Sequence, residues 1–190
     1  MHVIKYILSI TLIIFFTLTI VYASDPSKIE NFKLKDYNGK EHSLSDYNKS
    51  KAIVVMFIAT KCPVSNAYNS RMEKIFNDYK DKGISFIGIN SNKEESSVEI
   101  KEHAANNDLT FTILKDEKNI IADKFAASFT PEIYILSPKF EVVYHGRIDD
   151  SKREEDVTSQ DLKMALDEIL SDKPVSQPKT KAFGCTIKRI

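Results

Sequence analysis

Cysteine is scarce in this chain, which has 190 residues and only two cysteines, Cys62 and Cys185. Two thiols are too few for a disulfide-rich scaffold and for a four-ligand structural zinc site. A chain of this length buries enough apolar surface to hold one domain together without such support. The two cysteines could pair with each other or act alone, and their spacing leaves both options open.

An excess of one charge is also missing. The 27 basic and 27 acidic residues give no net formal charge. No basic excess indicates a nucleic-acid partner, and no acidic block indicates a solvated tail. Internal repeats and low-complexity stretches are lacking too, so we expect one ordinary globular domain that does not bind nucleic acid.

The first 23 residues are nearly free of charge. One lysine, Lys5, precedes an apolar run over residues 6–21, and the small residue Ala23 precedes a polar segment. This pattern predicts a secretory signal peptide over residues 1–23, cleaved after Ala23. An uncleaved membrane anchor formed by residues 6–21 is the alternative, because about 17–25 apolar residues span a bilayer. Either interpretation places the domain outside the cytoplasm, in the periplasm or secreted, where disulfides persist.

The rest of the chain alternates predicted strands and helices. Apolar, β-branched runs predict buried strands, and apolar residues spaced three or four apart predict helices. This order favours an α/β fold with a mixed central sheet flanked by helices, in a domain over 24–171 followed by an irregular tail over 172–190. We expect a hairpin around Asn38–Gly39, strands at 52–59, 84–89, 111–114, 132–136 and 141–145, and helices at 63–79, 96–106, 120–125 and 159–170.

Cys62 falls between a predicted strand and a predicted helix. Pro63 follows it, and proline is favoured at the first position of a helix. A thiol at a helix N-terminus faces unpaired N–H groups and the positive end of the helix dipole, which stabilise the thiolate. We therefore interpret Cys62 as a reactive thiol rather than a small buried hydrophobe. Lys61, the residue before it, could also stabilise the thiolate by its positive charge, but more weakly.

Five segments carry a family resemblance: residues 32–39, 44–47, 55–62, 144–150 and 184–189. The first three resemble the thioredoxin-like redoxins, which include the alkyl hydroperoxide reductase/thiol-specific antioxidant group and extracytoplasmic thiol-disulfide proteins, and the last two resemble a peroxiredoxin-like branch. The resemblance covers nearly all of the chain after the leader, and it implies a thioredoxin-like fold. It also implies a cis bond between Thr130 and Pro131 that faces the active cysteine and presents backbone groups to an extended substrate; a trans proline at the start of a strand is the alternative.

Two departures from these families bear on the chemistry. Thioredoxins carry Cys-x-x-Cys, but Ser65 stands at the second position here, which excludes a dithiol within this motif. Ser65 could donate to the thiolate or fill the place of a resolving thiol, and a surface serine is the alternative. Peroxiredoxins carry a threonine three residues before the cysteine, where this chain has Ala59, with Thr60 one residue nearer. They also place an arginine at about the position of Thr130–Pro131.

The remaining candidates each allow more than one role. Cys185 could resolve an oxidised Cys62, tie the tail to the domain by a disulfide, or be a buried inert thiol. Arg147 could lower the pKa of the thiolate or receive an anionic substrate. Alternatively, Asp149 and Asp150 could hold Arg147 in a surface ion pair. His103 and His145 lack ligand-like spacing and are expected to be surface or packing residues.

These observations predict an extracytoplasmic thiol oxidoreductase with Cys62 as nucleophile and with no cofactor or metal. In the first hypothesis it reduces peroxides, as an antioxidant, with an external thiol as reductant. In the second it exchanges disulfides with protein substrates as a monothiol. The third is a non-enzymatic binding or metallochaperone module, in which Cys62 would bind copper or haem. Neither a Cys-x-x-x-Cys motif nor a nearby ligand histidine supports that hypothesis.

Overall fold

The computed structural model describes residues 26–190. The predicted leader at 1–23, its cleavage site and its alternative as an anchor lie outside the described residues. Within residues 26–190, no helix combines the length and the apolar character needed to cross a membrane.

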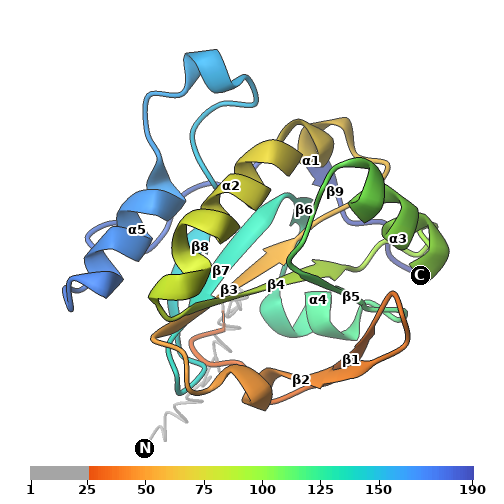
Figure 1. The fold of residues 1–190 in the computed structure, drawn as a ribbon, viewed down its shortest axis with the longest axis horizontal. Helices are drawn as coiled ribbons and strands as arrows, with labels where there is room; N and C mark the ends of the chain where they lie inside the picture. Colours follow the sequence, from red (N-terminus) through yellow and green to blue (C-terminus); the bar gives the residue numbers. More distant parts are fainter. Residues whose placement is uncertain (1–25) are drawn as a thin grey trace, which may run out of the picture.

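A seven-stranded mixed sheet forms the centre of the fold (Figure 1). Its strand order is β2-β1-β5-β4-β3-β7-β8, with β3 parallel to β4 and antiparallel to β7. The predicted mixed sheet and the N-terminal hairpin, β1 with β2, are confirmed. The strands are β1 (Lys33–Asp36), β2 (Glu41–Ser43), β3 (Ala52–Phe57), β4 (Ile84–Asn90), β5 (Thr112–Lys115), β7 (Glu132–Leu136) and β8 (Val142–Gly146), while β6 (Phe129–Thr130) and β9 (Cys185–Thr186) form a separate pair.

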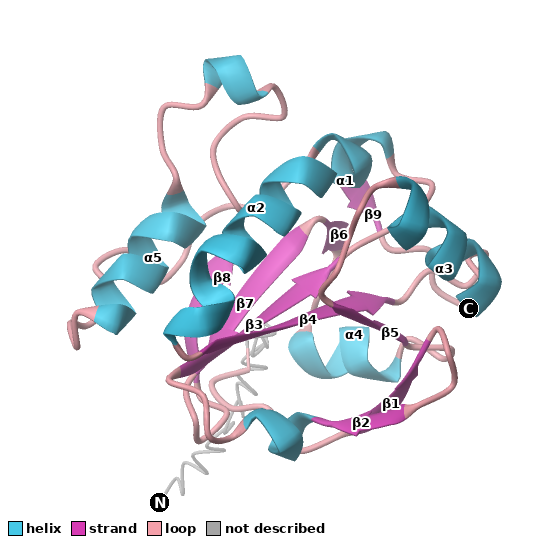
Figure 2. Ribbon diagram, in the orientation of Figure 1, coloured by secondary structure: helices cyan, strands magenta, loops and turns pink. Residues whose placement is uncertain are grey.

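Helices cover both faces of this sheet (Figure 2). The second, third and fifth helices pack against one face, and the fourth packs against the other. The helices are α1 (Pro63–Ala67), α2 (Asn69–Tyr79), α3 (Ser97–Asn106), α4 (Ile120–Phe125) and α5 (Asp161–Leu170), with 3₁₀ turns at Leu44–Tyr47, Lys80–Lys82 and Glu154–Asp156.

Side-chain alternation along β3 divides the core into two halves. Every residue of β3 is buried. Val54 and Met56 pack with α2, α3 and α5, whereas Val55 and Phe57 pack with α4, because successive strand residues point to opposite faces. Burial on both faces makes β3 a firm base for the loop that leads to Cys62.

The helix predicted over 63–79 is interrupted at Tyr68. The Tyr68 N–H donates to the carbonyl of Ser65 at 3.0 Å, a three-residue spacing instead of the four of an α-helix. The Tyr68 side chain is 1% exposed, and its hydroxyl donates to Asp149 at 2.9 Å. The interruption therefore coincides with a tertiary anchor that helical periodicity does not reveal.

Side chains cap the starts of the two helices predicted at 96–106 and 120–125. Ser96 and Glu99 make a capping box at the start of α3. The carboxylate of Asp116 accepts hydrogen bonds from the N–H groups of Ile121 and Ala122, each at 3.0 Å, and so caps α4 from the end of β5. These caps set the direction of the two helices that follow β4 and β5.

The tail after α5 runs alongside β8, the edge strand of the sheet. The Thr180 N–H donates to the carbonyl of His145 at 3.0 Å, and the His145 N–H donates to the carbonyl of Pro178 at 2.9 Å. Ile187 is buried, and β9 pairs antiparallel with β6. The tail has little regular secondary structure, yet it is packed against the domain and delivers Cys185 to the end of β3.

Candidate functional site

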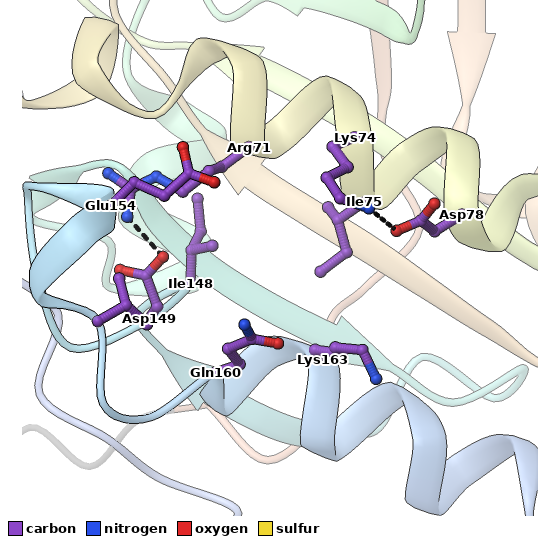
Figure 3. Close-up of a pocket in the computed structure, with 10 residues that line it drawn as sticks. Arg71, Lys74, Ile75, Asp78, Ile148, Asp149, Glu154, Gln160 and Lys163 are labelled. Carbon is purple, nitrogen blue, oxygen red and sulfur yellow. Dashed lines mark hydrogen bonds and ion pairs between the residues drawn. The ribbon is translucent and has the colours of Figure 1, made fainter.

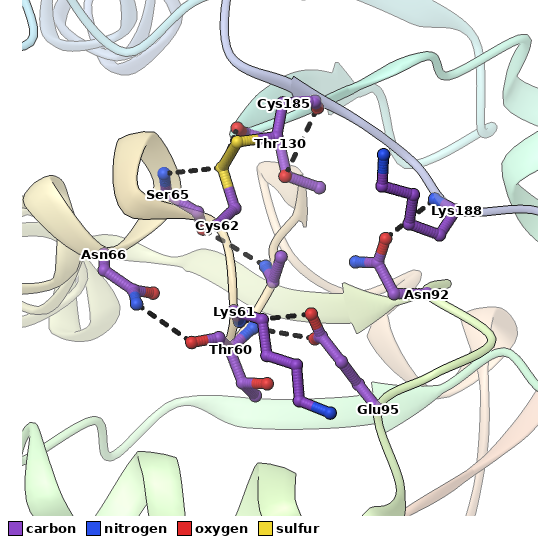
Figure 4. Close-up of a disulfide and its surroundings, with 11 residues drawn as sticks. Thr60, Lys61, Cys62, Ser65, Asn66, Asn92, Glu95, Thr130, Cys185 and Lys188 are labelled. Atoms are coloured by element: carbon purple, nitrogen blue, oxygen red, sulfur yellow. Dashed lines mark hydrogen bonds between the residues drawn. A yellow bond between two sulfur atoms is a disulfide. The ribbon is translucent and has the colours of Figure 1, made fainter.

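The two cysteines meet and form a disulfide (Figure 4). Their Cα atoms lie 5.9 Å apart although 123 residues separate them in sequence. The pairing that the sequence left open is therefore present, and the inert-thiol interpretation of Cys185 is wrong. A dithiol is excluded within the Cys-x-x-Ser motif, but the tail supplies the second thiol from elsewhere.

Cys62 occupies the N-cap position of α1, with Pro63 at the first helical position as predicted. The backbone N–H of Ser65 donates to the Cys62 Sγ at 3.2 Å. This bond and the helix dipole favour negative charge on the sulfur. The same Sγ lies 3.3 Å from the carbonyl oxygen of Thr130. Only 4% of the Cys62 surface is exposed, so its sulfur is sheltered in the oxidised form.

The loop around Pro131 contacts both cysteines. The Thr130–Pro131 bond is cis, as the resemblance implied. Thr130 is the residue of β6 that pairs with Cys185 of β9. Its carbonyl faces the sulfur of Cys62, and its backbone also pairs with the strand that carries Cys185.

Gly184 permits this close approach of β9. A Cβ atom at position 184 would overlap the carbonyl oxygen of Thr130. Any side chain would therefore push the tail, and Cys185 with it, away from the loop at Pro131. The glycine before Cys185 is a requirement of the pairing rather than a feature of a loose tail.

Ser65 is buried, so its interpretation as a surface serine is wrong. Its hydroxyl accepts a hydrogen bond from the Ala59 N–H at 3.1 Å. The backbone N–H of Ser65, rather than its hydroxyl, donates the hydrogen bond to the sulfur of Cys62. Ser65 thus ties the loop that enters the site to the first turn of α1.

Sequence reasoning missed Glu95, a buried carboxylate under the loop before Cys62. It accepts hydrogen bonds from the N–H groups of Thr60 at 2.7 Å and Lys61 at 3.1 Å. The ammonium of Lys61 contacts Glu99 at 2.8 Å, a hydrogen bond that raises the Lys61 pKa. Nothing in the local pattern distinguishes Glu95 from surface glutamates, because Thr60 and Lys61, which tie it to the Cys62 segment, lie more than thirty residues away.

Arg147 lies at the end of β8, and its ion pair is not the one that the sequence suggested. Its Nε donates to Asp161 at 2.6 Å, whereas Asp149 pairs with Arg71 at 2.6 Å. The expectation that Asp149 or Asp150 would hold Arg147 is therefore wrong. Burial disfavours the charged form of Arg147, but the hydrogen bond to Asp161 and the negative charge of Asp161 outweigh burial. Together they raise the pKa of Arg147. An action of Arg147 on Cys62 remains a prediction.

His145 is a packing residue, as expected. Its ring stacks on Tyr134 with centroids 4.2 Å apart, and its Nε2 lies 2.6 Å from the carboxylate of Glu132. Glu132 also accepts hydrogen bonds from the N–H groups of Ser128 and Phe129. Through these hydrogen bonds Glu132, in β7, holds the start of β6 in place.

His103 is also a packing residue: it lies 3.1 Å from the amide of Asn69, and burial lowers its pKa. Among residues 26–190, no group of three or more histidine, cysteine or acidic side chains is arranged to hold a metal ion.

A pocket of about 350 Å³ lies between α2 and α5 (Figure 3). Arg71 and Asp149 line it and pair with each other, as do Lys74 and Asp78 at 2.7 Å. Neither cysteine lines the pocket. Its charges neutralise one another, so the cysteine pair is the better candidate for chemistry.

The topology of the sheet and the position of Cys62 define this chain as a thioredoxin-like redoxin. Such a site supports thiol chemistry, because the sulfur is placed where the thiolate is stabilised. The chain belongs to the AhpC/TSA family, whose family model matches residues 26–149. The matched region includes Cys62 and the loop at Pro131, but it ends before Cys185.

Similar proteins are known from several bacteria. The Thioredoxin-like protein YneN of Bacillus subtilis (strain 168) is 36% identical over 110 residues, which cover 57% of this chain and 63% of YneN. The Thiol-disulfide oxidoreductase ResA of Halalkalibacterium halodurans is 26% identical over 113 residues, covering 60% of this chain and 62% of ResA. The match thus spans less than two thirds of each relative. The crystal structure of an uncharacterized conserved protein from Geobacillus kaustophilus has a TM-score of 0.80 and 32% identity, covering 87% of this chain and 92% of that chain.

Proposed function

We propose that this redoxin reduces peroxides through a cycle between a Cys62–Cys185 dithiol and a disulfide. The observation that carries the proposal is the pairing of β9 with β6, which brings Cys185 against Cys62. An extended substrate would use the backbone groups beside Pro131, and the chain's own tail occupies those of Thr130. A small substrate does not need that edge, so the geometry favours a peroxide over a protein.

The proposed cycle has three steps. The Cys62 thiolate attacks one peroxide oxygen, the O–O bond breaks, and an alcohol or water leaves while Cys62 becomes a sulfenic acid. The Cys185 thiolate then attacks the Cys62 sulfur, so that an S–S bond forms and the S–O bond breaks; the departing hydroxide takes up the proton that the Cys185 thiol released and leaves as water. Two equivalents of an external thiol reduce the disulfide and regenerate both cysteines.

Exchange with protein disulfides is the second candidate, and the similarity to ResA favours it. In that case the Cys62 thiolate attacks a substrate sulfur and releases a substrate thiolate, forming a mixed disulfide. Cys185 then attacks Cys62 and releases the second substrate thiol. The two candidates use the same cysteines and differ in what oxidises Cys62.

Reaction of the reduced chain with one equivalent of hydrogen peroxide tests the proposal. We expect the Cys62–Cys185 disulfide to form, as a loss of two mass units, while Cys185→Ser accumulates a Cys62 sulfenic acid that dimedone traps. Cys62→Ser is the matched control and should not react. If both thiols of the wild type survive peroxide but oxidise with insulin, disulfide exchange replaces peroxide reduction.

We further propose that the chain works outside the cytoplasm. The apolar leader before the domain and a disulfide that persists in oxidising compartments support this location. N-terminal sequencing of the protein expressed with its leader should find Ser24 as the first residue. A protein that keeps residues 1–23 and pellets with membranes would indicate the anchor instead.

A further inference from the structure

The loop between β4 and α3, residues 91–95, contacts both segments that carry the cysteines. We propose that this loop is a positioning element: Glu95 fixes the Cys62 segment and Asn92 fixes the Cys185 segment. Together they hold the two sulfurs within bonding distance before the disulfide forms. The inference rests on the proposed function, because it concerns the same pair of cysteines.

Glu95 holds the Cys62 side. Its two carboxylate oxygens accept hydrogen bonds from the consecutive N–H groups of Thr60 and Lys61, at 2.7 and 3.1 Å (Figure 4). Only 4% of Glu95 is exposed, so water competes little for these bonds. Hydrogen bonds to a charged acceptor are stronger than those between neutral groups. The two residues before Cys62 are thereby fixed to the loop.

Asn92 holds the Cys185 side. Its Oδ1 accepts a hydrogen bond from the Lys188 N–H at 2.8 Å, and the Lys93 N–H donates to the Lys188 carbonyl at 2.9 Å. Lys188 lies three residues after Cys185. The Asn92 Nδ2 is buried and has no hydrogen-bond partner in the described part of the chain. Removing the Asn92 side chain therefore removes one bond, the one to the tail.

The loop itself is held from within the domain. The Asn90 amide donates to Glu95 at 2.5 Å, and the Lys115 ammonium donates to the Asn92 carbonyl at 2.6 Å. The Ser91 hydroxyl donates to Asp116 at 2.9 Å. β4, β5 and the cap of α4 all hold the loop in place. The loop can therefore keep the two segments that it binds at a fixed distance from each other.

The consequence concerns the reduced protein. Two thiols held on one support have a high effective concentration toward each other, and this concentration sets how readily the disulfide forms. Loss of either contact lets one segment move while the other stays. We therefore expect each loss to lower the equilibrium constant for disulfide formation about tenfold, the effect of one hydrogen bond to a charged or buried group.

The test measures the oxidised fraction of the full-length chain in glutathione redox buffers. Glu95→Ala and Asn92→Ala should each shift the equilibrium with glutathione about tenfold toward the dithiol. Glu95→Gln keeps an acceptor for one of the two N–H groups and should fall between Glu95→Ala and the wild type. The matched control is Glu73→Ala, which removes a glutamate bonded to the N–H of Thr110, in another part of the fold.

Two outcomes would overturn the inference. One is an equilibrium with glutathione that is unchanged in both Asn92→Ala and Glu95→Gln. The other is a shift in the Glu73→Ala control as large as theirs, since that would indicate a general loss of stability. Both outcomes are distinct from failure of the proposed function, in which the wild type forms its disulfide with glutathione but does not consume peroxide.

Discussion

Breaking the Cys62–Cys185 bond should lower the free energy of unfolding by several kcal/mol. The disulfide closes a loop across 123 residues. Loop-closure entropy in the unfolded chain gives about 5 kcal/mol for a loop of this length. We expect the folded state to change little on reduction, because the pairing of β9 with β6 and the burial of Ile187 do not themselves require the covalent bond. We therefore expect a loss of about 2–5 kcal/mol, with the loop-closure value as its upper limit.

Urea unfolding of three samples measures this loss: the oxidised wild type, the wild type in excess reductant, and Cys185→Ser. The reduced wild type and Cys185→Ser should agree within about 1 kcal/mol, since both lack the cross-link. A thermodynamic cycle equates the difference in unfolding free energy between the oxidised and reduced chains with the difference in the free energy of disulfide formation between the folded and unfolded chains. A loss of about 4 kcal/mol means that the folded chain favours the disulfide about a thousandfold more than the unfolded chain does.

Two results would refute this reasoning. Equal unfolding free energies for oxidised and reduced wild type would mean that the folded state does not hold the thiols together. A tail that becomes sensitive to protease on reduction, with the rest of the domain still folded, would mean that the bond, rather than β9 and the loop at 91–95, keeps the tail in place. Either result would also remove the basis for a fixed resolving thiol.

Three further predictions concern individual residues. Gly184→Ala should prevent the disulfide while leaving Cys62 open to iodoacetamide; a disulfide that forms at the wild-type rate would contradict the overlap inferred for position 184. Glutathione should attack Cys185, which is the more exposed cysteine, so that mass mapping finds glutathione there and a free thiol at Cys62; the reverse arrangement would show that burial does not direct the attack. Ser65→Ala leaves the N–H of Ala59 without its acceptor and should cost about 1–3 kcal/mol of stability without preventing the disulfide; unchanged urea unfolding would contradict the role of the hydroxyl.

The fold was largely predictable because its signals are local. The apolar runs that became β3, β4 and β7 and the capping box at Ser96 each lie within a few residues of sequence. The position of Cys62 at the start of α1 followed from the strand before it and Pro63 after it. The break at Tyr68 was not predictable, because it coincides with a contact to a loop about eighty residues away.

The candidate site was predictable in part, for the same reason. The cis bond before Pro131 followed from the family resemblance, in which Thr130–Pro131 precedes a strand. The partner of Cys185 depends on where the tail crosses the domain, and no local pattern encodes that path. Glu95 and Asp161 were missed because each is a common polar residue whose partner lies in a distant segment.

The pairing of β9 with β6 limits which substrates the reduced chain can reduce. The edge of β6 next to Pro131 is where an extended substrate would pair, and Thr130 is paired there with Cys185 itself. A peptide can reach that edge only if the tail leaves, and the contacts of Ile187 and Lys188 oppose its departure. A peroxide needs only access to the sulfur of Cys62. If a protein does prove to be the substrate, its reaction should therefore become faster when Asn92→Ala loosens the tail, whereas reduction of hydrogen peroxide should not.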